Sequence, residues 1–415
     1  MREMKDSGLQ WAGDIPQYWN IAKGKHFMAV LERLVRDDDN VITCFRDGEV
    51  TLRSNRREDG FTVATVEAGY QGIEPGDLVV HGMDGFAGAI GISDSRGKGT
   101  PALNVLSCSE NKKYIMYLLR AMAYTEVFMA LSTGIRVRTC DTNWKKLKSL
   151  DYLIPPADEQ QCIADFLDAK CAEIDALTAD IQTQINTLEQ YKRSVITETV
   201  TKGLDPNAEM KDSGIQWIGD MPAHWGVIRG KYILRYMQKP VRENDGVITC
   251  FRDGEVTLRS NRREEGFTMS DKEIGYQGID VGDLVVHGMD GFAGSIGISD
   301  SRGKASPVLN VLETDQNKRY IMYYLRSMAY SDVFLALATG IRVRSCDLRW
   351  NKLAELSYPV PPLNEQNAIV KHIDSVLSKA DAVIADKKAQ LATLDEYKKS
   401  LIFEYVTGKK EVPIS

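Results

Sequence analysis

Two arginine-rich runs contain the residues whose chemistry is easiest to interpret. Six residues of the first run return in the second, namely Arg46, Arg53, Ser54, Asn55, Arg56 and Arg57, and then Arg252, Arg259, Ser260, Asn261, Arg262 and Arg263. Arginine pairs bidentately with guanine and asparagine with adenine, while arginine or serine can hold a phosphate. A solvated hairpin would explain one such run equally well. Because the run occurs twice, we favour a surface that binds DNA.

Two further pairs of basic segments have the composition of phosphate-binding loops. One is Ser95-Arg96-Gly97-Lys98, which returns with Arg302 and Lys304. The other supplies four more arginines, Arg136, Arg138, Arg342 and Arg344. Lysine and arginine in such loops neutralise phosphates and release counterions. We therefore predict that these residues also bind DNA.

Motifs that would indicate catalysis are missing from the sequence. It has no glycine-rich dinucleotide or P-loop motif, no His-Glu-x-x-His and no Gly-x-Ser-x-Gly. It also lacks the Asn-Pro-Pro-aromatic run that holds a flipped adenine in amino-methyltransferases, and no metal-ligand spacing is present. His81 and His287 precede equivalent Gly-Met-Asp-Gly turns, and we interpret them as structural. A binding protein is favoured over an enzyme.

The chain is one unit of 206 residues written twice. Between residues 41–107 and 247–313 there are 54 identities in 67 positions, whereas residues 157–200 and 363–406 share 17 of 44. The globular parts are therefore nearly the same module, and the segments after them have kept their pattern more than their residues. Such a repeat predicts pseudo-twofold symmetry and a target that is itself twofold or bipartite.

Composition is that of a soluble cytoplasmic protein. The net charge is −6, but residues 151–209 hold 4 basic and 12 acidic residues, a balance of 4 − 12 = −8. Each globular part is nearly neutral, so clustered arginines can still form a basic face. No apolar run is long enough to span a membrane. Two pairs of cysteines recur, Cys44 with Cys250 and Cys140 with Cys346, and we read them as reduced, buried thiols, with disulfides as the alternative.

Local patterns predict an α+β module. Residues 41–46 and 49–53 have strand composition and flank Asp47-Gly48, a hairpin-turn dipeptide. Residues 76–81 and 86–92 are further strand candidates. A helix is expected from Asn111 to about Leu131, ending near Thr133-Gly134.

Each repeat ends in a segment with the pattern of a coiled coil. After Pro155-Pro156 and Pro361-Pro362, no glycine or proline occurs up to residues 202 and 407. Apolar residues recur at alternating spacings of four and three, at Ile163, Leu167, Ile174, Leu177, Ile181, Leu188, Tyr191 and Val195, and at Ile369, Ile373, Val376, Ala380, Val383, Leu394, Tyr397 and Leu401. Lys170, Gln184, Lys387 and Gln390 interrupt the two seams. An amphipathic helix on a globular core is the alternative, but about 39 residues would extend roughly 58 Å.

Several segments of the sequence together resemble the specificity subunit of type I restriction–modification systems. They are Asp212 to Gly219 with Pro222 and Trp225, the corresponding Asp6 to Trp19, Gly76 to Val79, Thr339 to Arg342, and Pro361 to Gln366 before the long helix. The Pro-Pro-x-x-Glu-Gln start of a heptad helix, present twice at the repeat spacing, is the specific part. The resemblance covers essentially the whole chain.

The resemblance implies two α/β target-recognition domains, related by a pseudo-twofold axis and separated by two long antiparallel coiled-coil helices. The implied divisions are residues 1–154 and 206–360 for the domains, and 155–205 and 361–415 for the connector helices. Each domain would read half of a bipartite, near-palindromic duplex DNA site. The family's two recognition domains often differ, whereas these two are nearly the same.

The resemblance also implies partners for a chain that has no catalytic activity of its own. Two modification subunits would carry S-adenosylmethionine, and restriction subunits, if present, would carry ATP. Two other hypotheses remain open. One is a self-contained DNA-modifying enzyme with an unrecognised active site, and the other is a coiled-coil scaffold that binds only proteins.

Overall fold

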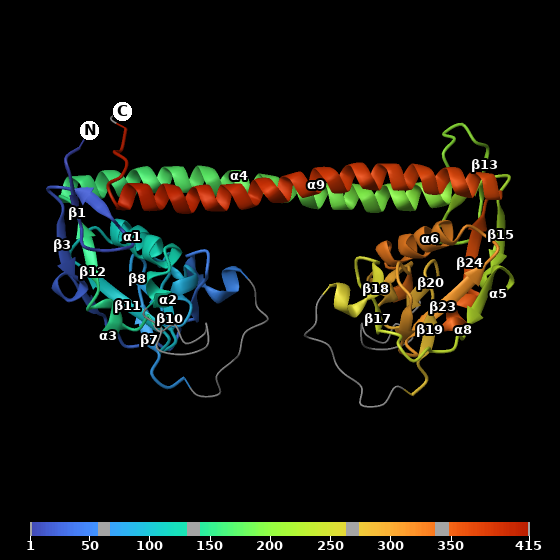
Figure 1. Cartoon of the computed structure of the whole chain (residues 1–415), viewed down its shortest axis with the longest axis horizontal. Coiled ribbons are helices and arrows are strands. Elements are labelled where there is room, and N and C mark those ends of the chain that lie inside the picture. Colours follow the sequence, from blue (N-terminus) through green and yellow to red (C-terminus); the bar gives the residue numbers. More distant parts are fainter. Residues whose placement is uncertain (1, 57–66, 131–141, 263–273, 337–347, 414–415) are drawn as a thin grey trace. The chain divides into compact units, whose positions relative to one another are not determined.

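The protein forms two compact units, each built from one copy of the repeat and parts of both long helices. The computed structural model describes residues 2–56, 67–130, 142–262, 274–336 and 348–413. Unit 1 comprises Met1–Ile181 and Lys388–Ser415, and unit 2 comprises Gln182–Lys387 (Figure 1). The four-part division expected from the sequence cuts the chain differently, before each long helix, and stays a prediction.

An antiparallel four-stranded sheet lies at the centre of unit 1, in the order β4-β11-β8-β9. Its strands are β4 (Met28–Val30), β8 (Leu78–His81), β9 (Ile90–Ile92) and β11 (Leu103–Cys108). Leu78 and Val80 belong to the same apolar core as helix α1 (Lys112–Tyr124), whereas Val79 lies in the core beneath β5 (Ile42–Cys44) and β6 (Val50–Leu52). Because both faces of β8 are covered, its sequence is a continuous apolar run.

Short elements surround this sheet. Three more antiparallel pairs join β1 (Met4–Asp6) to β2 (Asp14–Pro16), β3 (Asn20–Lys23) to β12 (Asp151–Ile154), and β7 (Gln71–Ile73) to β10 (Gly97–Gly99). The remaining short helices are η1 (Gly24–His26), η2 (Arg53–Asn55), η3 (Gly85–Ala87), α2 (Val127–Ala130) and α3 (Trp144–Leu147).

Unit 2 repeats this arrangement. Its central sheet has the order β16-β23-β20-β21. Its strands are β13 (Met210–Asp212), β14 (Asp220–Pro222), β15 (Gly226–Arg229), β16 (Leu234–Met237), β17 (Ile248–Cys250), β18 (Val256–Leu258), β19 (Gln277–Ile279), β20 (Leu284–His287), β21 (Ile296–Ile298), β22 (Gly303–Ala305), β23 (Leu309–Thr314) and β24 (Ser357–Val360). Its short helices are α5 (Gly230–Ile233), η5 (Arg259–Asn261), η6 (Gly291–Ala293), α6 (Lys318–Tyr330), α7 (Val333–Ala336) and α8 (Trp350–Glu355).

The hairpin is confirmed, and the strand expected over residues 76–81 forms from Leu78 to His81, but two other predicted elements are wrong in extent. The strand expected over residues 86–92 begins only at Ile90, because Gly85–Ala87 forms a 3-10 turn and Gly88 has φ +94°. The helix expected to reach about Leu131 ends at Tyr124, because Glu126 adopts a left-handed φ of +60°. No glycine or proline marks that break, so the apolar pattern continues across it.

Both long helices are confirmed, as α4 (Ala157–Lys202) and α9 (Leu363–Val406). They run antiparallel within each unit. In unit 1 Phe166 contacts Tyr405 and Lys398 pairs with Asp175, while in unit 2 Lys192 pairs with Asp381 at 2.6 Å. Two residues predicted as polar interruptions, Gln184 and Lys387, hydrogen-bond to each other.

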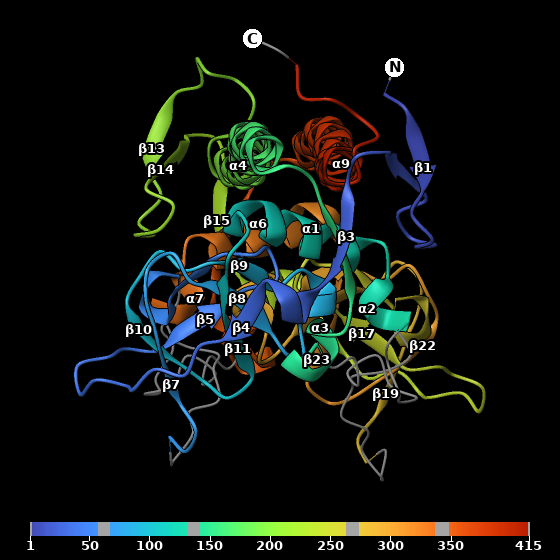
Figure 2. The ribbon, with the colours of Figure 1, turned by 90° about the vertical axis from the view of Figure 1, so that its left-hand side faces the viewer.

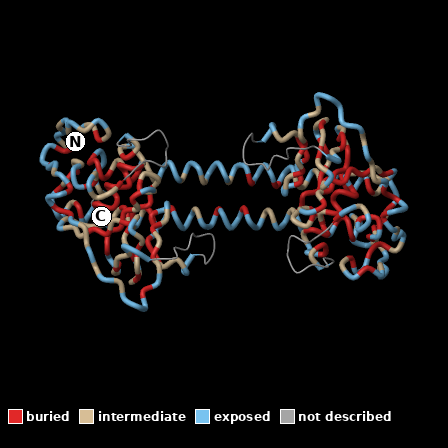
Figure 3. The backbone as a smooth tube through the Cα atoms, turned by 90° about the horizontal axis from the view of Figure 1, so that it is seen from below, coloured by how far each residue is buried: buried red, intermediate tan, exposed pale blue. Residues whose placement is uncertain are grey.

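The heptad assignment is wrong at four aromatic or aliphatic positions. These side chains are about half exposed and do not lie in a buried seam: Leu177, Tyr191, Val383 and Tyr397. Ile185, Ile196 and Val200 are buried instead. The helices are otherwise largely exposed, and buried residues gather in the sheet and helix layers of each unit (Figure 3).

The carboxyl end of each long helix packs against a tryptophan. In unit 2, α4 ends at Lys202, and the next residue, Gly203 with φ +75°, lies against Trp225, whose indole N–H donates to Glu365. In unit 1, α9 ends at Val406, and Gly408 shortly after it lies against Trp19, whose indole N–H donates to Glu159. Both ends of the chain lie on unit 1, where Arg2 pairs with Glu411 at 2.7 Å (Figure 2).

The described cysteines are free thiols, as expected. Cys44 and Cys250 are buried at equivalent places, and burial raises the pKa of each to about 12. Cys140 and Cys346 lie outside the described residues.

Candidate nucleic-acid interface

The arginine-rich run of unit 1 lies on the β5–β6 hairpin and the turn that follows it. Phe45 and Glu49 close the hairpin, and Gly48 has φ +89°. From helix α1, the buried Arg120 donates to the carbonyl of Gly48 at 2.9 Å and to that of Ile90 at 2.8 Å. The helix therefore ties the hairpin turn to the edge of the central sheet. Arg326 makes the same two hydrogen bonds in unit 2.

Side chains of the run fold back on the hairpin. Arg53 Nε donates to Thr43 at 3.4 Å, and the Asn55 amide donates to Thr51 at 2.8 Å. Ser54 lies between them in η2, so Arg53, Ser54 and Asn55 form one 3-10 turn. Unit 2 repeats this geometry with Arg259, Ser260 and Asn261.

Arg56 has a guanidinium that three partners hold in place. It pairs with Asp47 at 2.7 Å and Glu49 at 3.2 Å, and it lies 4.3 Å from the centre of the Phe45 ring. The cation–π interaction and two carboxylates hold the group in one orientation while 36% of the side chain stays exposed. Arg262 is held in the same way by Asp253, Glu255 and Phe251.

Arg46 is the most exposed arginine described at this hairpin, at 66%. It pairs with Asp84 at 2.8 Å, and Arg252 pairs with Asp290 at 3.1 Å. Exposed ion pairs are worth about 0–1 kcal/mol. Exchanging such a carboxylate for a DNA group would therefore cost little.

Two histidines noted in the sequence border the same arginines. His81 Nδ1 accepts from the backbone N–H groups of Met83 and Asp84, at 3.2 and 3.1 Å. Burial chiefly lowers the pKa of His81, so the ring is neutral at neutral pH. His287 accepts the same two hydrogen bonds and has a pKa lowered in the same way. Sequence reasoning did not count these residues among the binding candidates, although the His-Gly-Met-Asp-Gly run occurs in both copies.

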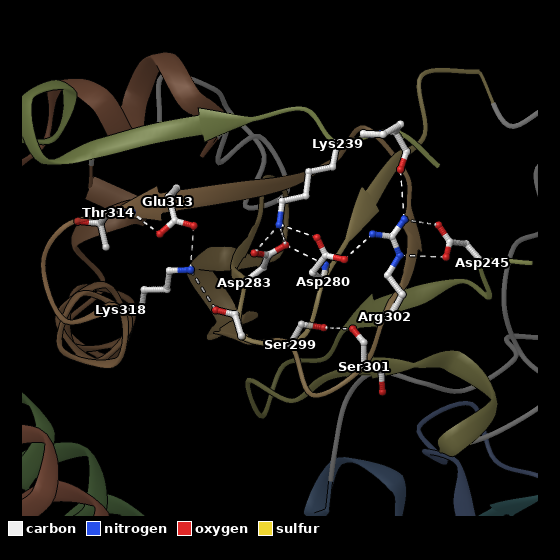
Figure 4. A network of polar contacts seen from close by, with 12 residues as sticks. Lys239, Asp245, Asp280, Asp283, Ser299, Ser301, Arg302, Glu313, Thr314 and Lys318 are labelled. Atoms are coloured by element: carbon white, nitrogen blue, oxygen red, sulfur yellow. Dashed lines mark hydrogen bonds and ion pairs between the residues drawn. The ribbon is translucent and has the colours of Figure 1, made fainter. Parts of the chain in front are cut away.

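Arg96 and Arg302 have a different environment from the hairpin arginines. Arg302 donates to Asp245 at 2.8 and 3.0 Å, to Asp280, and to the Pro240 carbonyl at 3.2 Å (Figure 4). Its side chain is only 22% exposed, and that of Asp245 is 5% exposed. These hydrogen bonds fasten the 240s loop to β22. The prediction that Arg96 and Arg302 bind DNA stays untested, but their partners favour a structural role.

Ion pairs in this network lower the pKa of a carboxyl group in both units. The Arg302 guanidinium, followed by Lys239, lowers the pKa of Asp280 to about 2. Arg96 likewise lowers the pKa of Asp39 to about 2. Arg33 stands in unit 1 where unit 2 has Lys239, and each pairs with the buried aspartate of the network, Asp77 or Asp283.

The other predicted DNA-binding residues divide into two groups. Lys98 pairs with Glu67 at 2.7 Å and is 17% exposed, and Lys304 occupies the same place in β22. Six arginines lie outside the described residues, namely Arg57, Arg136, Arg138, Arg263, Arg342 and Arg344.

The described ranges contain no cluster of three or more His, Cys, Asp or Glu side chains arranged to hold a metal. Within those ranges, no helix is both long and apolar enough to cross a membrane. What the structure does present is the same arginine-bearing hairpin twice. The fold therefore belongs to the class of proteins that carry two equivalent modules, each packed on a pair of long helices and suited to recognise one part of a target.

Comparison with known proteins agrees with this class. No protein-family model matches the chain. The specificity subunit of the type I restriction enzyme MjaX from Methanocaldococcus jannaschii is 24% identical over 444 residues, covering 96% of this chain and 95% of that protein. The StySPI specificity subunit of a type I restriction enzyme from Salmonella potsdam is 19% identical over 425 residues, covering 96% and 90%.

A solved structure shares the fold. A chain from a study of complex assembly and conformational transition of the type I restriction–modification system has a TM-score of 0.67 and 13% identity, covering 95% of this chain and 99% of that chain. The curated homologues of this protein are thus specificity subunits of type I restriction enzymes. The resemblance noted in the sequence is confirmed along nearly the whole chain.

Proposed function

We propose that this protein is the DNA-sequence specificity subunit of a type I restriction–modification complex. The observation that carries the proposal is the similarity to named specificity subunits over 96% of the chain. The duplicated arginine hairpin supports it, because a bipartite site needs two reading modules. Each module would read one half of a near-palindromic duplex site.

The hairpin geometry suggests how each module meets DNA. Arg46 and Arg252 are exposed and held by single carboxylates, so they can exchange partners cheaply. Arg56 and Arg262 are held by two carboxylates and a ring, which orients the guanidinium for a bidentate interaction. Fixed donors of this kind suit base edges better than mobile lysines do.

Partners would supply the chemistry. Two modification subunits would dock on this chain and carry S-adenosylmethionine, and restriction subunits, where a host has them, would carry ATP. This chain would have no catalytic activity of its own and would act in the cytoplasm. The similarity to named specificity subunits supports this assignment of roles.

A methyl-transfer assay tests the proposal against its rivals. The purified chain, its modification subunits and the reconstituted complex are each incubated with DNA and labelled S-adenosylmethionine. We expect sequence-specific methylation only from the complex. Methyl transfer by the chain alone would favour a self-contained enzyme. A chain that retains no DNA selectively, alone or in the complex, would favour a protein scaffold.

A further inference from the structure

A hollow beside the hairpin of unit 2 combines hydrogen-bond donors and acceptors. It has a volume of about 560 Å³, and its lining includes Arg252, Arg262, His287, Asp290 and Ser295. The equivalent residues of unit 1 are Arg46, Arg56, His81, Asp84 and Ala89. Of these five positions only the last differs between the two copies, so any function of the hollow should be present twice.

The histidine in this hollow presents a fixed donor. Because Nδ1 of His287 accepts from the N–H groups of Met289 and Asp290, at 3.2 and 2.9 Å, the proton of the neutral ring lies on Nε2. Among the residues that the structure describes, the nearest carboxylate oxygen is on Asp290, 4.0 Å from Nε2. That distance is too long for a hydrogen bond, so this N–H is available to a ligand.

Carboxylates in the hollow exclude a phosphate as the preferred ligand. Asp290 and Asp253 line it beside Arg252 and Arg262, so the cations are already balanced. Such a site suits a neutral group that has both acceptors and donors. The Ser295 hydroxyl is buried and has no hydrogen-bond partner among the described residues, and Ala89 takes its place in unit 1, so the donors and acceptors of the hollow are the other four side chains.

We propose that this hollow reads a G·C base pair from the major groove, and that the equivalent residues of unit 1 read another. The Nε2–H of His287 and the Arg252 guanidinium would donate to O6 and N7 of guanine, while Asp290 would accept from N4 of cytosine. In the major groove a G·C pair offers two neighbouring acceptors and one donor. This inference rests on the proposed function. It makes His81 and His287 residues that recognise a base pair rather than a phosphate.

His287→Asn is the variant that isolates the donor. An asparagine oxygen can accept from the backbone N–H groups two and three residues later, as His287 Nδ1 does. Its amide NH2 branches from Cγ, where histidine has Cδ2, so this donor falls short of the position of Nε2–H. The full-length chain with its modification subunits is used to select sequences from a randomised duplex DNA library at physiological ionic strength. The two half-sites recovered from one selection serve as controls for each other.

The wild type should recover two half-sites, each with a fixed G·C pair. H287N should recover one unchanged half-site and one in which that pair has become degenerate, a loss of discrimination on the order of tenfold or more. H81N should give the same pattern, and the H81N/H287N protein should lose the pair in both halves. Arg252→Gln, on a side chain that is 66% exposed, should relax the same position without a folding defect.

Three results would overturn the inference. H287N could recover both half-sites unchanged, or lose the pair equally in both halves, or R252Q could relax a different position. Each of these leaves the proposed function standing, because the wild type still selects a motif. A wild-type protein that selects no motif would overturn both the inference and the proposed function.

Discussion

At the scale of single residues, the hairpin arginines differ in how firmly they are held. Arg56 has two carboxylates and the Phe45 ring, whereas Arg46 has one carboxylate and is mostly exposed. A fixed guanidinium loses less conformational entropy when it meets a base. Arg56 and Arg262 are therefore the residues at which loss of a side chain should weaken specific binding most.

Replacing Arg56 and Arg262 together by alanine should weaken specific DNA binding by about 1–3 kcal/mol for each base that an arginine no longer reads. If they hold phosphates instead, the slope of log affinity against log salt should fall by about 1 per residue. Binding isotherms at several salt concentrations measure both. The control is Lys25→Ala with Lys231→Ala, which removes the same charge from equivalent exposed positions. Unchanged affinity and salt slope would remove the hairpins from the interface.

Gly48 should tolerate no side chain, for two separate reasons. Its φ of +89° disfavours alanine, and an added Cβ would lie 1.9 Å from the Arg120 guanidinium, which holds the hairpin turn. Gly8 has φ +69° with nothing within 4 Å of the same position. Gly8→Ala should therefore cost only about 1–2 kcal/mol of strain. Gly48→Ala should cost roughly 2 kcal/mol more, because a charged hydrogen bond is broken. Equal destabilisation in urea unfolding would contradict this account.

At the scale of elements, the sequence predicted the hairpin and the two long helices, which have local signals. It missed features that are set by contacts between distant parts of the chain. Asp47-Gly48 and the flanking alternation identified the hairpin, and the absence of glycine and proline identified α4 and α9. The left-handed Glu126 could not be foreseen, because no glycine marks it. Arg120 was missed as a supporting residue, because a helical pattern reads a buried arginine as one more polar position.

The sequence showed which residue types could bind DNA, but it did not show whether each side chain is exposed or enclosed by partners. Arg56 and Arg96 have the same side chain, but one lies on an exposed hairpin and the other is enclosed by Asp39 and Glu74. The partners of Arg96 are distant in the sequence, whereas those of Arg56 are close to it. Only the folded structure therefore distinguishes the enclosed arginine from the exposed one. His81 was interpreted as structural from its turn. That interpretation accounts for Nδ1 but leaves Nε2 without a role.

The acidic network should make stability depend on pH in the acid range. Asp39 and Asp280 have folded-state pKa values of about 2, against an unfolded value near 3.8. Lowered pKa values mean that their stabilisation is complete above about pH 4 and is lost as the pH falls towards 2. Urea unfolding between pH 6 and pH 2.5 should show this loss.

Asp39→Asn and Asp280→Asn serve as the comparison for that experiment. Each variant should be less stable than the wild type near pH 6, because Arg96 or Arg302 then loses one of its two charged partners. Each should also show a shallower decline between pH 4 and pH 2.5, because one carboxylate with a lowered pKa is absent. Parallel curves for wild type and variants would show that these carboxylates do not carry the acid sensitivity.

At the scale of the whole molecule, both units have the same elements. The end of α9 occupies in unit 1 the place that the end of α4 occupies in unit 2. In unit 1 the Tyr114 hydroxyl donates to the carbonyls of Leu153 and Val406, near the end of α9. In unit 2 the Tyr320 hydroxyl donates to the carbonyls of Pro359 and Val200, near the end of α4. The two modules are therefore equivalent in construction as well as in sequence, and they should read nearly the same bases.

Methylome sequencing of a strain that expresses this chain with its modification subunits tests the central claim most directly. We predict a new methylated site in two parts, separated by a spacer, in which the half-sites are closely similar and inverted. A strain with the modification subunits alone is the control and should lack this site. Two unrelated half-sequences would contradict the equivalence of the modules. No new methylated site at all would contradict the role of this protein in DNA specificity.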